Sequence, residues 1–164
     1  MKLIVSDSTT IITLLNIDRM DILENIFEQV IIPSKVHNEI CIKNITLNDS
    51  FFMKKEIEDK TLYKLLSKNL DAGESEALVL AIEMDLSLII DEKKGRRIAH
   101  NMGISIMGIL GVLLLGYKRN YLQYDEIREI YKAIKEADFR VSKKLEERFF
   151  YLLGEAKSHV GKYD

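Results

Sequence analysis

The sequence predicts an α/β fold, a three-layer α/β/α sandwich around a small parallel sheet. Short apolar runs alternate along the 164 residues with longer stretches of helical spacing, an order typical of parallel sheets covered by helices. The apolar runs lack polar alternation, as expected for strands buried on both faces. The length is that of one domain, so we expect a single domain over residues 1–164, with C-terminal helices from about residue 121 packed on it.

The first predicted strand lies at the start of the chain and ends on an acid. Lys2–Ser6 is a short, mainly apolar run, and Asp7 follows it directly. A helical pattern then begins at once, with apolar residues at Ile11, Ile12, Leu14 and Leu15. An acid at the carboxyl end of a parallel strand lies where α/β proteins place their chemistry. Asp7, Ser8 and Thr9 are also good helix N-caps, so a purely structural interpretation stays open.

A short helix and a second strand come next. Helical spacing predicts a helix over Asp18–Phe27, and the apolar run Gln29–Ile32 predicts the strand. Pro33 ends that strand and is favourable in the first turn of the following helix, which we expect over Ser34–Ile42. This helix places Glu39 on or near its apolar face.

The middle of the chain is predicted to be helical after a polar turn. Phe51–Leu66 has candidate core positions at helical spacing, namely Ile57, Leu62, Leu65 and Leu66. Gly73 marks a break before the next helix, Glu74–Met84. Glu76, in the first turns of that helix, is expected at the surface.

The second half of the chain repeats the order of strand and helix. Strands are predicted over Ser87–Ile90 and Ile104–Met107, followed by helices over Lys94–Asn101 and Ile109–Tyr117. Two amphipathic helices, Tyr124–Glu136 and Ser142–Gly154, complete the chain. We expect their apolar residues in the core, with a dimer contact as the alternative; these residues are Ile127, Ile130, Tyr131, Ile134, Leu145, Phe149, Phe150 and Leu152.

Composition excludes several classes of protein. The single cysteine, Cys41, cannot form an intramolecular disulfide and fits a reducing compartment, and its apolar neighbours predict a buried thiol. No Cys/His spacing resembles a zinc site. No signal peptide is apparent, and the most apolar stretch, residues 104–116, is too short to span a bilayer. We therefore expect a cytoplasmic protein without a membrane partner.

Charge is distributed unevenly although the formal net charge is only −2. Residues 1–50 carry seven acidic side chains against four basic ones, whereas residues 91–120 carry six basic against two acidic. This asymmetry permits an acidic cleft beside a basic rim, which suits a metal site that handles a polyanion. A solvated helix face is the alternative interpretation of the basic cluster.

The acids of interest are predicted to meet at the carboxyl edge of the sheet. Asp7 ends the first strand, and Asp91 and Glu92 end the third. Glu74 lies in the first turn of a helix, and Glu39 lies on the helix after the second strand. Converging carboxylates repel one another unless a cation compensates, and oxygen-only ligands favour Mg²⁺ or Mn²⁺. Each acid alone has a structural alternative as a helix cap or a surface residue.

With these positions in hand, the chain resembles the PIN-domain family of metal-dependent ribonucleases, which includes VapC-like toxins. The matching segments are Ile4–Thr9, Ile32–Ile40, Gly73–Leu78, Ile89–Arg97 and Met107–Leu113. The last segment is similar to a branch of the family with a Gly-Glu pair before the third acid. The resemblance covers essentially the whole chain and implies a PIN-like, Rossmann-like fold.

The resemblance also implies roles for individual residues. Asp7, Glu39 and Glu74 would be the first three acids that hold the metal and support catalysis. Asp91 is preferred as the fourth, with Glu92 as the other candidate. Supporting and RNA-binding residues are implied too: Ser8 or Thr9 beside the first acid, Arg96 on phosphate, and Lys93, Lys94 and Arg97 in a basic rim. Glu74 departs from the commoner aspartate, being one methylene longer.

The main functional hypothesis is a Mg²⁺- or Mn²⁺-dependent endoribonuclease that hydrolyses RNA phosphodiesters. The resemblance further implies the toxin of a type II toxin–antitoxin pair, blocked by a cognate antitoxin protein and forming a homodimer. The alternative is a catalytically weak or inactive PIN-fold module that binds nucleic acid or protein and acts in regulation. A third class, a DNA nuclease or phosphatase on a similar scaffold, is also open. No P-loop or Gly-x-Gly-x-x-Gly fingerprint indicates nucleotide-cofactor chemistry.

Overall fold

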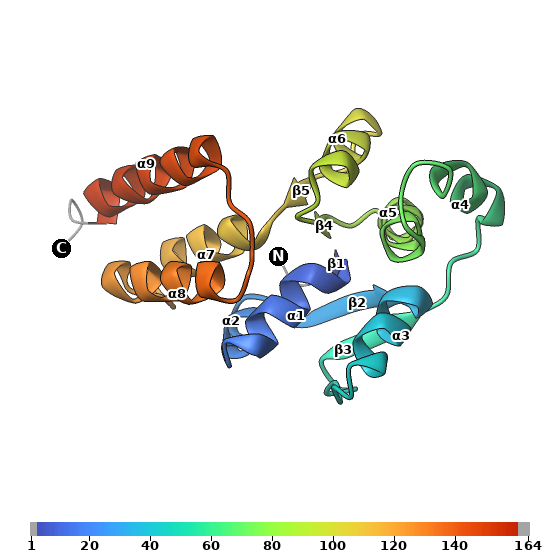
Figure 1. Ribbon diagram of the computed structural model, residues 1–164, viewed down its shortest axis with the longest axis horizontal. Coiled ribbons are helices and arrows are strands. Elements are labelled where there is room, and N and C mark those ends of the chain that lie inside the picture. The colour runs from blue at the N-terminus through green and yellow to red at the C-terminus, as the bar shows by residue number, and fades with distance from the viewer. Residues whose placement is uncertain (1–2, 161–164) are drawn as a thin grey trace. The chain divides into compact units, whose positions relative to one another are not determined.

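The computed structural model describes residues 3–160, and the side chains of residues 3–157, so that Lys2 and the side chain of His159 lie outside the described part. Within it, the chain divides into two compact units (Figure 1). Unit 1 comprises residues 3–12 and 27–109, and unit 2 comprises residues 13–26 and 110–160. Every strand of the described chain lies in unit 1, so unit 1 contains the whole sheet.

Unit 1 is built on a five-stranded parallel sheet in the described residues, which confirms the α/β prediction. The strand order is β3-β2-β1-β4-β5. The strands are β1 (Leu3–Ser6), β2 (Gln29–Pro33), β3 (Phe52–Lys55), β4 (Leu88–Ile89) and β5 (Ile106–Met107). Strands β2 and β3 lie on one side of β1, and β4 and β5 lie on the other side. The direction in which strands are added to the sheet therefore reverses between β1 and β4. Such a reversal creates a crevice at the carboxyl ends of the strands.

Both faces of the central strands are buried, as a three-layer arrangement requires. Val5, Ile31 and Leu88 belong to a cluster with α5 (Ala72–Met84) and with residues of α4 (Lys60–Leu66) and α6 (Lys93–Asn101). Neighbouring residues point to the opposite face and are buried as well, with Ile4, Val30 and Ile32 fully inaccessible. The predicted lack of polar alternation is therefore explained by burial on two sides.

Helix α3 (Ser34–Ile42) has the predicted bounds, but its thiol is not buried. Val36 and Ile40, one turn apart, are the buried residues of this helix. Cys41 is exposed, with its Sγ 3.6 Å from Nδ1 of His37. The prediction of a buried thiol was wrong because Cys41 follows Ile40 by about 100° around the helix axis, which turns it away from the core.

The helix predicted over Phe51–Leu66 is wrong in its first part. Phe52–Lys55 forms β3, whose backbone pairs with β2 from Val30↔Phe52 to Pro33↔Lys55, and α4 begins only at Lys60. The burial pattern explains why local spacing misses this strand. Phe52 is buried and the next three residues are exposed, so no alternation announces an edge strand.

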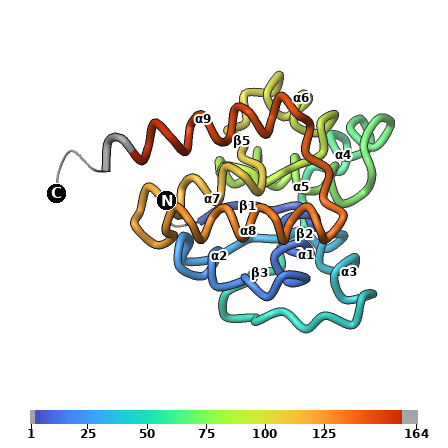
Figure 2. The backbone as a smooth tube through the Cα atoms, turned by 60° about the vertical axis from the view of Figure 1, so that its left-hand side comes forward, coloured from blue at the N-terminus to red at the C-terminus, as the bar shows by residue number. Residues whose placement is uncertain are grey.

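Unit 2 is helical in its described residues. It contains α2 (Asp21–Ile26), most of α7 (Ile109–Lys118), α8 (Tyr124–Glu136), α9 (Lys143–Val160) and the end of α1 (Ser8–Asn16). Helices α8 and α9 lie side by side (Figures 1 and 2) and contact each other through aromatic rings, with Tyr131 and Phe149 stacked at 5.8 Å between centroids. The predicted core residues of α8 are buried, whereas Leu145 of α9 is 45% exposed, contrary to prediction. No helix among the described residues is both long and apolar enough to cross a bilayer.

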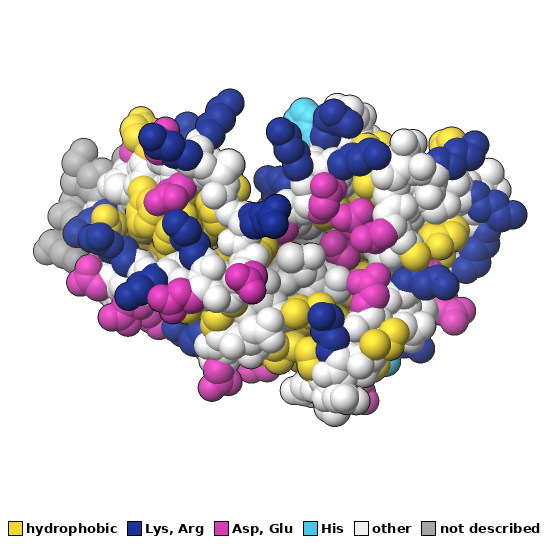
Figure 3. All heavy atoms as spheres, viewed as in Figure 1, with side chains coloured by type: hydrophobic (Ala, Val, Ile, Leu, Met, Phe, Trp, Pro, Cys, Tyr) yellow, Lys and Arg dark blue, Asp and Glu magenta, His cyan; other side chains and the backbone are white. Residues whose placement is uncertain are grey.

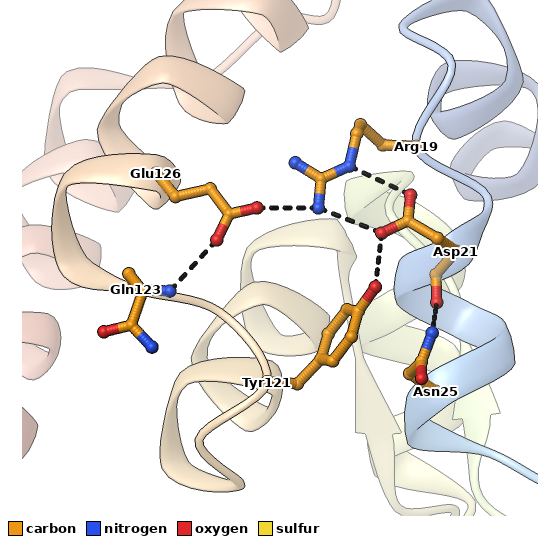
Figure 4. A network of polar contacts seen from close by, with 6 residues as sticks. All are labelled: Arg19, Asp21, Asn25, Tyr121, Gln123 and Glu126. Carbon is orange, nitrogen blue, oxygen red and sulfur yellow. Dashed lines mark hydrogen bonds and ion pairs between the residues drawn. The ribbon is translucent and has the colours of Figure 1, made fainter.

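A polar network joins three segments of unit 2 (Figure 4). Arg19 binds both carboxylate oxygens of Asp21, at 2.9 and 3.0 Å, and its Nη2 also donates to Glu126 at 2.9 Å. The hydroxyl of Tyr121 donates to Asp21 at 2.6 Å. The start of α2, the turn after α7 and the start of α8 are thereby held together.

Candidate active site

The first and fourth predicted acids lie at the carboxyl ends of β1 and β4, where the strand order reverses and α/β folds form a crevice. Asp7 follows β1 directly, and its backbone N–H donates to the carbonyl of Ile89 in β4 at 3.0 Å. Asp91 lies two residues after β4. The two strands that flank the reversal of strand order thus bring these residues to one edge of unit 1.

Asp7 is an acid whose surroundings disfavour its charge. Its side chain is only 5% exposed. Burial is the main reason why its pKa rises to about 7, and the carboxylates of Glu74, Asp71 and Glu39 raise it further, against a hydrogen bond from the backbone of Ser8 that lowers it. A role as a helix N-cap alone does not explain why three other carboxylates surround Asp7.

Glu39 reaches the same crevice from the second turn of α3. The Ser8 hydroxyl donates to its Oε2 at 2.7 Å, which fixes the carboxylate beside Asp7. The Glu39 carboxylate also lies over the backbone of Gly73, so that a Cβ at that position would collide with its Oε1. A side chain at Gly73 would therefore displace the Glu39 carboxylate from its observed place.

Glu74 follows that glycine and combines two roles that the sequence left as alternatives. Its backbone N–H donates to Asp71 at 2.8 Å and its carboxylate accepts from the Asp71 N–H at 3.3 Å, a capping box at the start of α5. It is also 7% exposed, and its pKa is raised to about 7 by burial first and then by Asp71, Glu92 and Glu39. Asp71 is thus a further acid of the cluster, which the prediction missed although the Asp-x-x-Glu spacing signals it.

Asp91 and Glu92 take different positions. Asp91 accepts hydrogen bonds from the Ile109 N–H at 2.8 Å and from the Thr10 hydroxyl. Burial raises its pKa, while Thr10, Ile109 and Arg96 act in the opposite direction. Glu92 is exposed and caps α6 by accepting from the Gly95 N–H at 2.8 Å. Both acids therefore accept hydrogen bonds: Asp91 at the edge of the sheet, and Glu92 at the N-terminus of α6, near Glu74.

Some of the predicted hydroxyl and basic residues contact the acids, and others are exposed. Ser8 contacts Glu39, Thr9 is half-buried, and Thr10, which the prediction did not include, holds Asp91. Arg96 donates from Nη1 to the carbonyl of Ile90 at 2.8 Å and faces Asp91. The remaining basic residues of α6 are exposed; they are Lys93, Lys94 and Arg97.

Glu76 corrects the expectation of a surface residue. It is 5% exposed, and its Oε1 accepts from the backbone N–H of Lys35 in the first turn of α3 at 2.9 Å. Helix α5 is buried all round from Gly73 to Ala81, so this part of the helix has no solvent-facing side. Glu76 instead connects α5, which carries Glu74, to α3, which carries Glu39.

The donor set suits a hard divalent cation. Asp7, Glu39 and Glu74 supply only oxygen atoms, which Mg²⁺ and Mn²⁺ prefer. As placed in the described part of the chain, no three or more His, Cys, Asp or Glu side chains already form a metal-holding group. Burial first, and then repulsion between the carboxylates, raises the pKa of Asp7 and Glu74, and a bound cation would relieve the repulsion.

Comparisons with known proteins agree with this architecture. The profile of the family DUF3368, described as a PIN domain, matches residues 3–155. A PilT N-terminus domain protein, SSO1118 from the hyperthermophilic archaeon Sulfolobus solfataricus P2, has a similar structure with a TM-score of 0.50 and 19% sequence identity. The match covers 69% of this chain and 91% of the archaeal one. No curated protein matches the chain.

Proposed function

The chain belongs to the DUF3368 family of PIN domains. Because the PIN domain is a nuclease-type fold, we propose that the protein is a metal-dependent endoribonuclease. The observation that carries the proposal is the convergence of Asp7, Glu39 and Glu74 on one crevice, with the pKa of Asp7 and Glu74 raised to about 7. Such raised values concentrate at functional sites, because a fold without use for the cluster would avoid its cost.

Asp7, Glu39 and Glu74 would hold Mg²⁺ or Mn²⁺, with Asp91 or Glu92 as the fourth acid. When bound, the ion supplies an activated water and stabilises the charge that develops on the scissile phosphate. Asp91 is the more deeply placed of the two, and Glu92 is nearer to Glu74. A divalent cation binds the ionised form of Asp7. Because the pKa of Asp7 is near 7, binding of the cation would release protons at neutral pH.

Residues around the acids act by positioning them. Ser8 orients Glu39 through its 2.7 Å hydrogen bond, and the absence of a side chain at Gly73 leaves that carboxylate its place. Thr10 and the Ile109 N–H hold Asp91. The exposed Lys93, Lys94 and Arg97 of α6 would bind phosphates that flank the scissile bond, while Arg96 sits closer to the acids.

The toxin role extends the same proposal to partners. From the resemblance of the sequence to PIN-domain ribonucleases, a family that includes VapC-like toxins, we propose a cytoplasmic toxin that a cognate antitoxin blocks, with a homodimer as the functional form. Because the family match spans both units, we treat residues 1–164 as one functional domain. The substrate in this scheme is RNA, whose cleavage the antitoxin would prevent.

One observation favours a second candidate, a binding or regulatory module of the same fold with weak or no activity. Asp91 already accepts hydrogen bonds from the Thr10 hydroxyl and the Ile109 N–H, so it is engaged within the fold. In such a module the acids would serve as helix caps and backbone acceptors alone.

Cleavage of a mixed, structured RNA pool separates the two. Purified wild type, Asp7→Asn and the matched control Asp49→Asn, which changes an exposed loop residue, are compared in Mg²⁺, Mn²⁺ and EDTA, with circular dichroism to verify folding. We expect cutting by wild type and Asp49→Asn, loss of cutting in EDTA, and a fall of at least about 100-fold for Asp7→Asn, because a metal ion stabilises the transition state by several kcal/mol. Absence of cutting by wild type in either metal would favour the binding module, and cutting of single-stranded DNA alone would replace RNA by DNA as substrate.

A further inference from the structure

Helix α4 carries a row of lysines that the acidic crevice does not explain. Lys60, Lys64 and Lys68 are spaced four residues apart and are all exposed. Lys60 and Lys64 belong to α4, and Lys68 lies in the turn after its C-cap, Ser67. The helix itself contains no acidic residue. We call these three residues the α4 lysine row.

The three lysines of the row are exposed and carry charge that the ion pairs of the described residues do not neutralise. The ion pairs seen among the described residues involve Arg19 and Lys135 and none of these lysines. Like charges one turn apart destabilise a helix by a few tenths of a kcal/mol, and α4 has only seven residues to bear that cost. Lys64 also lies in the last turn of α4, where a cation is favourable, so a helix role explains part of the row but not its exposed charge at three successive turns.

The last lysine of the row, Lys68, lies close to the acidic crevice. Lys68 precedes Asp71 by three residues, so their Cα atoms lie within about 11 Å, and Asp71 caps the helix that carries Glu74. In the space-filling view, Lys and Arg side chains gather over α6 and over α4, with acidic side chains between them (Figure 3). Basic surfaces thus border the crevice on two sides of unit 1.

A hollow lies beside the row. It measures about 470 Å³ and is lined by Asp59, Thr61, Leu62, Lys64, Leu65 and Lys68. Leu65 is 59% exposed within α4, and Leu62 is half-buried. Apolar side chains next to cationic ones suit a strand that presents bases and phosphates together, better than they suit a purely ionic ligand.

We infer that the α4 lysine row and the hollow beside it form a second RNA-binding surface, which holds the phosphates of the strand a few nucleotides from the scissile bond. This inference rests on the proposed ribonuclease function. It assigns α4 to one side of the bound strand and α6 to the other. Lys60, Lys64 and Lys68 contribute charge, and Leu62 and Leu65 offer an apolar surface to an unpaired base.

The test measures binding of a 20-nucleotide single-stranded RNA to Asp7→Asn, in which cleavage is suppressed, over a series of KCl concentrations in Mg²⁺. The triple variant Lys60→Gln/Lys64→Gln/Lys68→Gln in that background is expected to bind about tenfold or more weakly at low salt. The slope of log K against log [KCl] should fall by about 2, since each phosphate contact contributes about 0.7 on single strands.

Two controls isolate the charge of the row. The triple Lys→Arg variant at the same positions keeps the charge and should bind as the parent does. Lys43→Gln removes an exposed lysine at the C-cap of α3, the end away from the carboxyl ends of the strands, and should leave the slope unchanged, whereas a lost phosphate contact would lower it by about 0.7.

The outcomes distinguish the two levels of the proposal. If the parent binds RNA and the triple Gln variant binds equally well with the same slope, the α4 surface is wrong and the ribonuclease proposal stands. Equal losses in the Gln and Arg triple variants would overturn the electrostatic role of the row. If even wild type neither binds nor cuts RNA, the proposed function itself fails and this inference falls with it.

Discussion

At the scale of single residues, Asp7 makes the stability of the metal-free protein depend on pH. Its pKa is about 7 in the folded protein against an ordinary value of 3.8, so the folded state binds a proton more tightly than the unfolded state. The stability that this proton contributes is complete below pH 4 and is lost as the pH rises towards 7. Asp7 therefore disfavours the folded state at neutral pH.

Replacing Asp7 by Asn should remove that pH dependence. In EDTA, we expect Asp7→Asn to be more stable than wild type at pH 8 by about 2–4 kcal/mol, because the wild-type protein must ionise a carboxyl whose pKa is about 7 in the folded state and 3.8 in the unfolded state. The difference should shrink towards pH 4. Urea unfolding at several pH values checks this, with Asp49→Asn as the control. A wild type that is as stable as Asp7→Asn at pH 8 would contradict the raised pKa.

Gly73 is a second residue with a sharp expectation. Alanine is favoured over glycine in a helix by about 1 kcal/mol, yet a Cβ here collides with the Glu39 carboxylate. Gly73→Ala should therefore weaken Mn²⁺ binding about tenfold or more while the melting temperature changes little. Gly154→Ala is the matched control, because its Cβ meets nothing within 4 Å. Unchanged Mn²⁺ affinity in Gly73→Ala would show that Glu39 does not need its observed place.

Glu76 is expected to act on stability and, through α3, on the site. Glu76→Ala leaves the Lys35 N–H without its acceptor, at a cost of about 1–3 kcal/mol. Glu76→Gln keeps an amide oxygen at that position and should cost clearly less. Thermal unfolding of both variants tests this ordering. Equal losses would mean that the negative charge, and not the hydrogen bond, stabilises the start of α3.

At the scale of elements, the start of α2 depends on an ionised Asp21. Arg19 lowers the pKa of Asp21, with Tyr121 acting in the same direction, so this contribution is present above the ordinary carboxyl pKa and is lost as the pH falls through the folded value. Since Asp21 is 39% exposed, screening limits the gain. We expect Asp21→Asn to destabilise the protein by about 1 kcal/mol at pH 7 and hardly at all near pH 2. A loss that persists at low pH would point to packing instead of charge.

The predictability of the elements follows the range of the interactions that form them. Helix α3 could be placed to the residue because Pro33 fixes its start and Val36 and Ile40 mark its buried side. Strand β3 could not, because only its pairing with β2, about 22 residues earlier along the chain, makes Phe52–Lys55 extended. Edge strands with one buried residue carry no local signal.

The site was predictable in part for the same reason. Asp7, Glu39 and Glu74 could be named because strand ends and helix starts meet at one edge of a parallel sheet. The sequence does not reveal that Thr10 holds Asp91, or that Glu76 turns inward to Lys35, since both contacts join segments that are distant along the chain. Asp71 was within reach of the capping-box spacing.

At the scale of the whole molecule, the acids and the basic surfaces of α4 and α6 belong to unit 1, while unit 2 contributes helices and the Arg19 network. The family match nevertheless extends through residue 155, so both units recur together in this family. The proposed chemistry thus belongs to the unit that contains the sheet, and it depends on the binding of a divalent cation by the acids of the crevice.

The most direct measurement is calorimetric titration of Mn²⁺ into wild type and Asp7→Asn at pH 6.5, in two buffers of different ionisation enthalpy. Because the pKa of Asp7 and Glu74 lies near 7, both groups are largely protonated at pH 6.5, and we expect binding accompanied by release of about one to two protons. Asp7→Asn should bind at least about tenfold more weakly and release fewer protons. Equal Mn²⁺ binding by the two proteins, or none by wild type, would contradict a metal centre at this edge of the sheet.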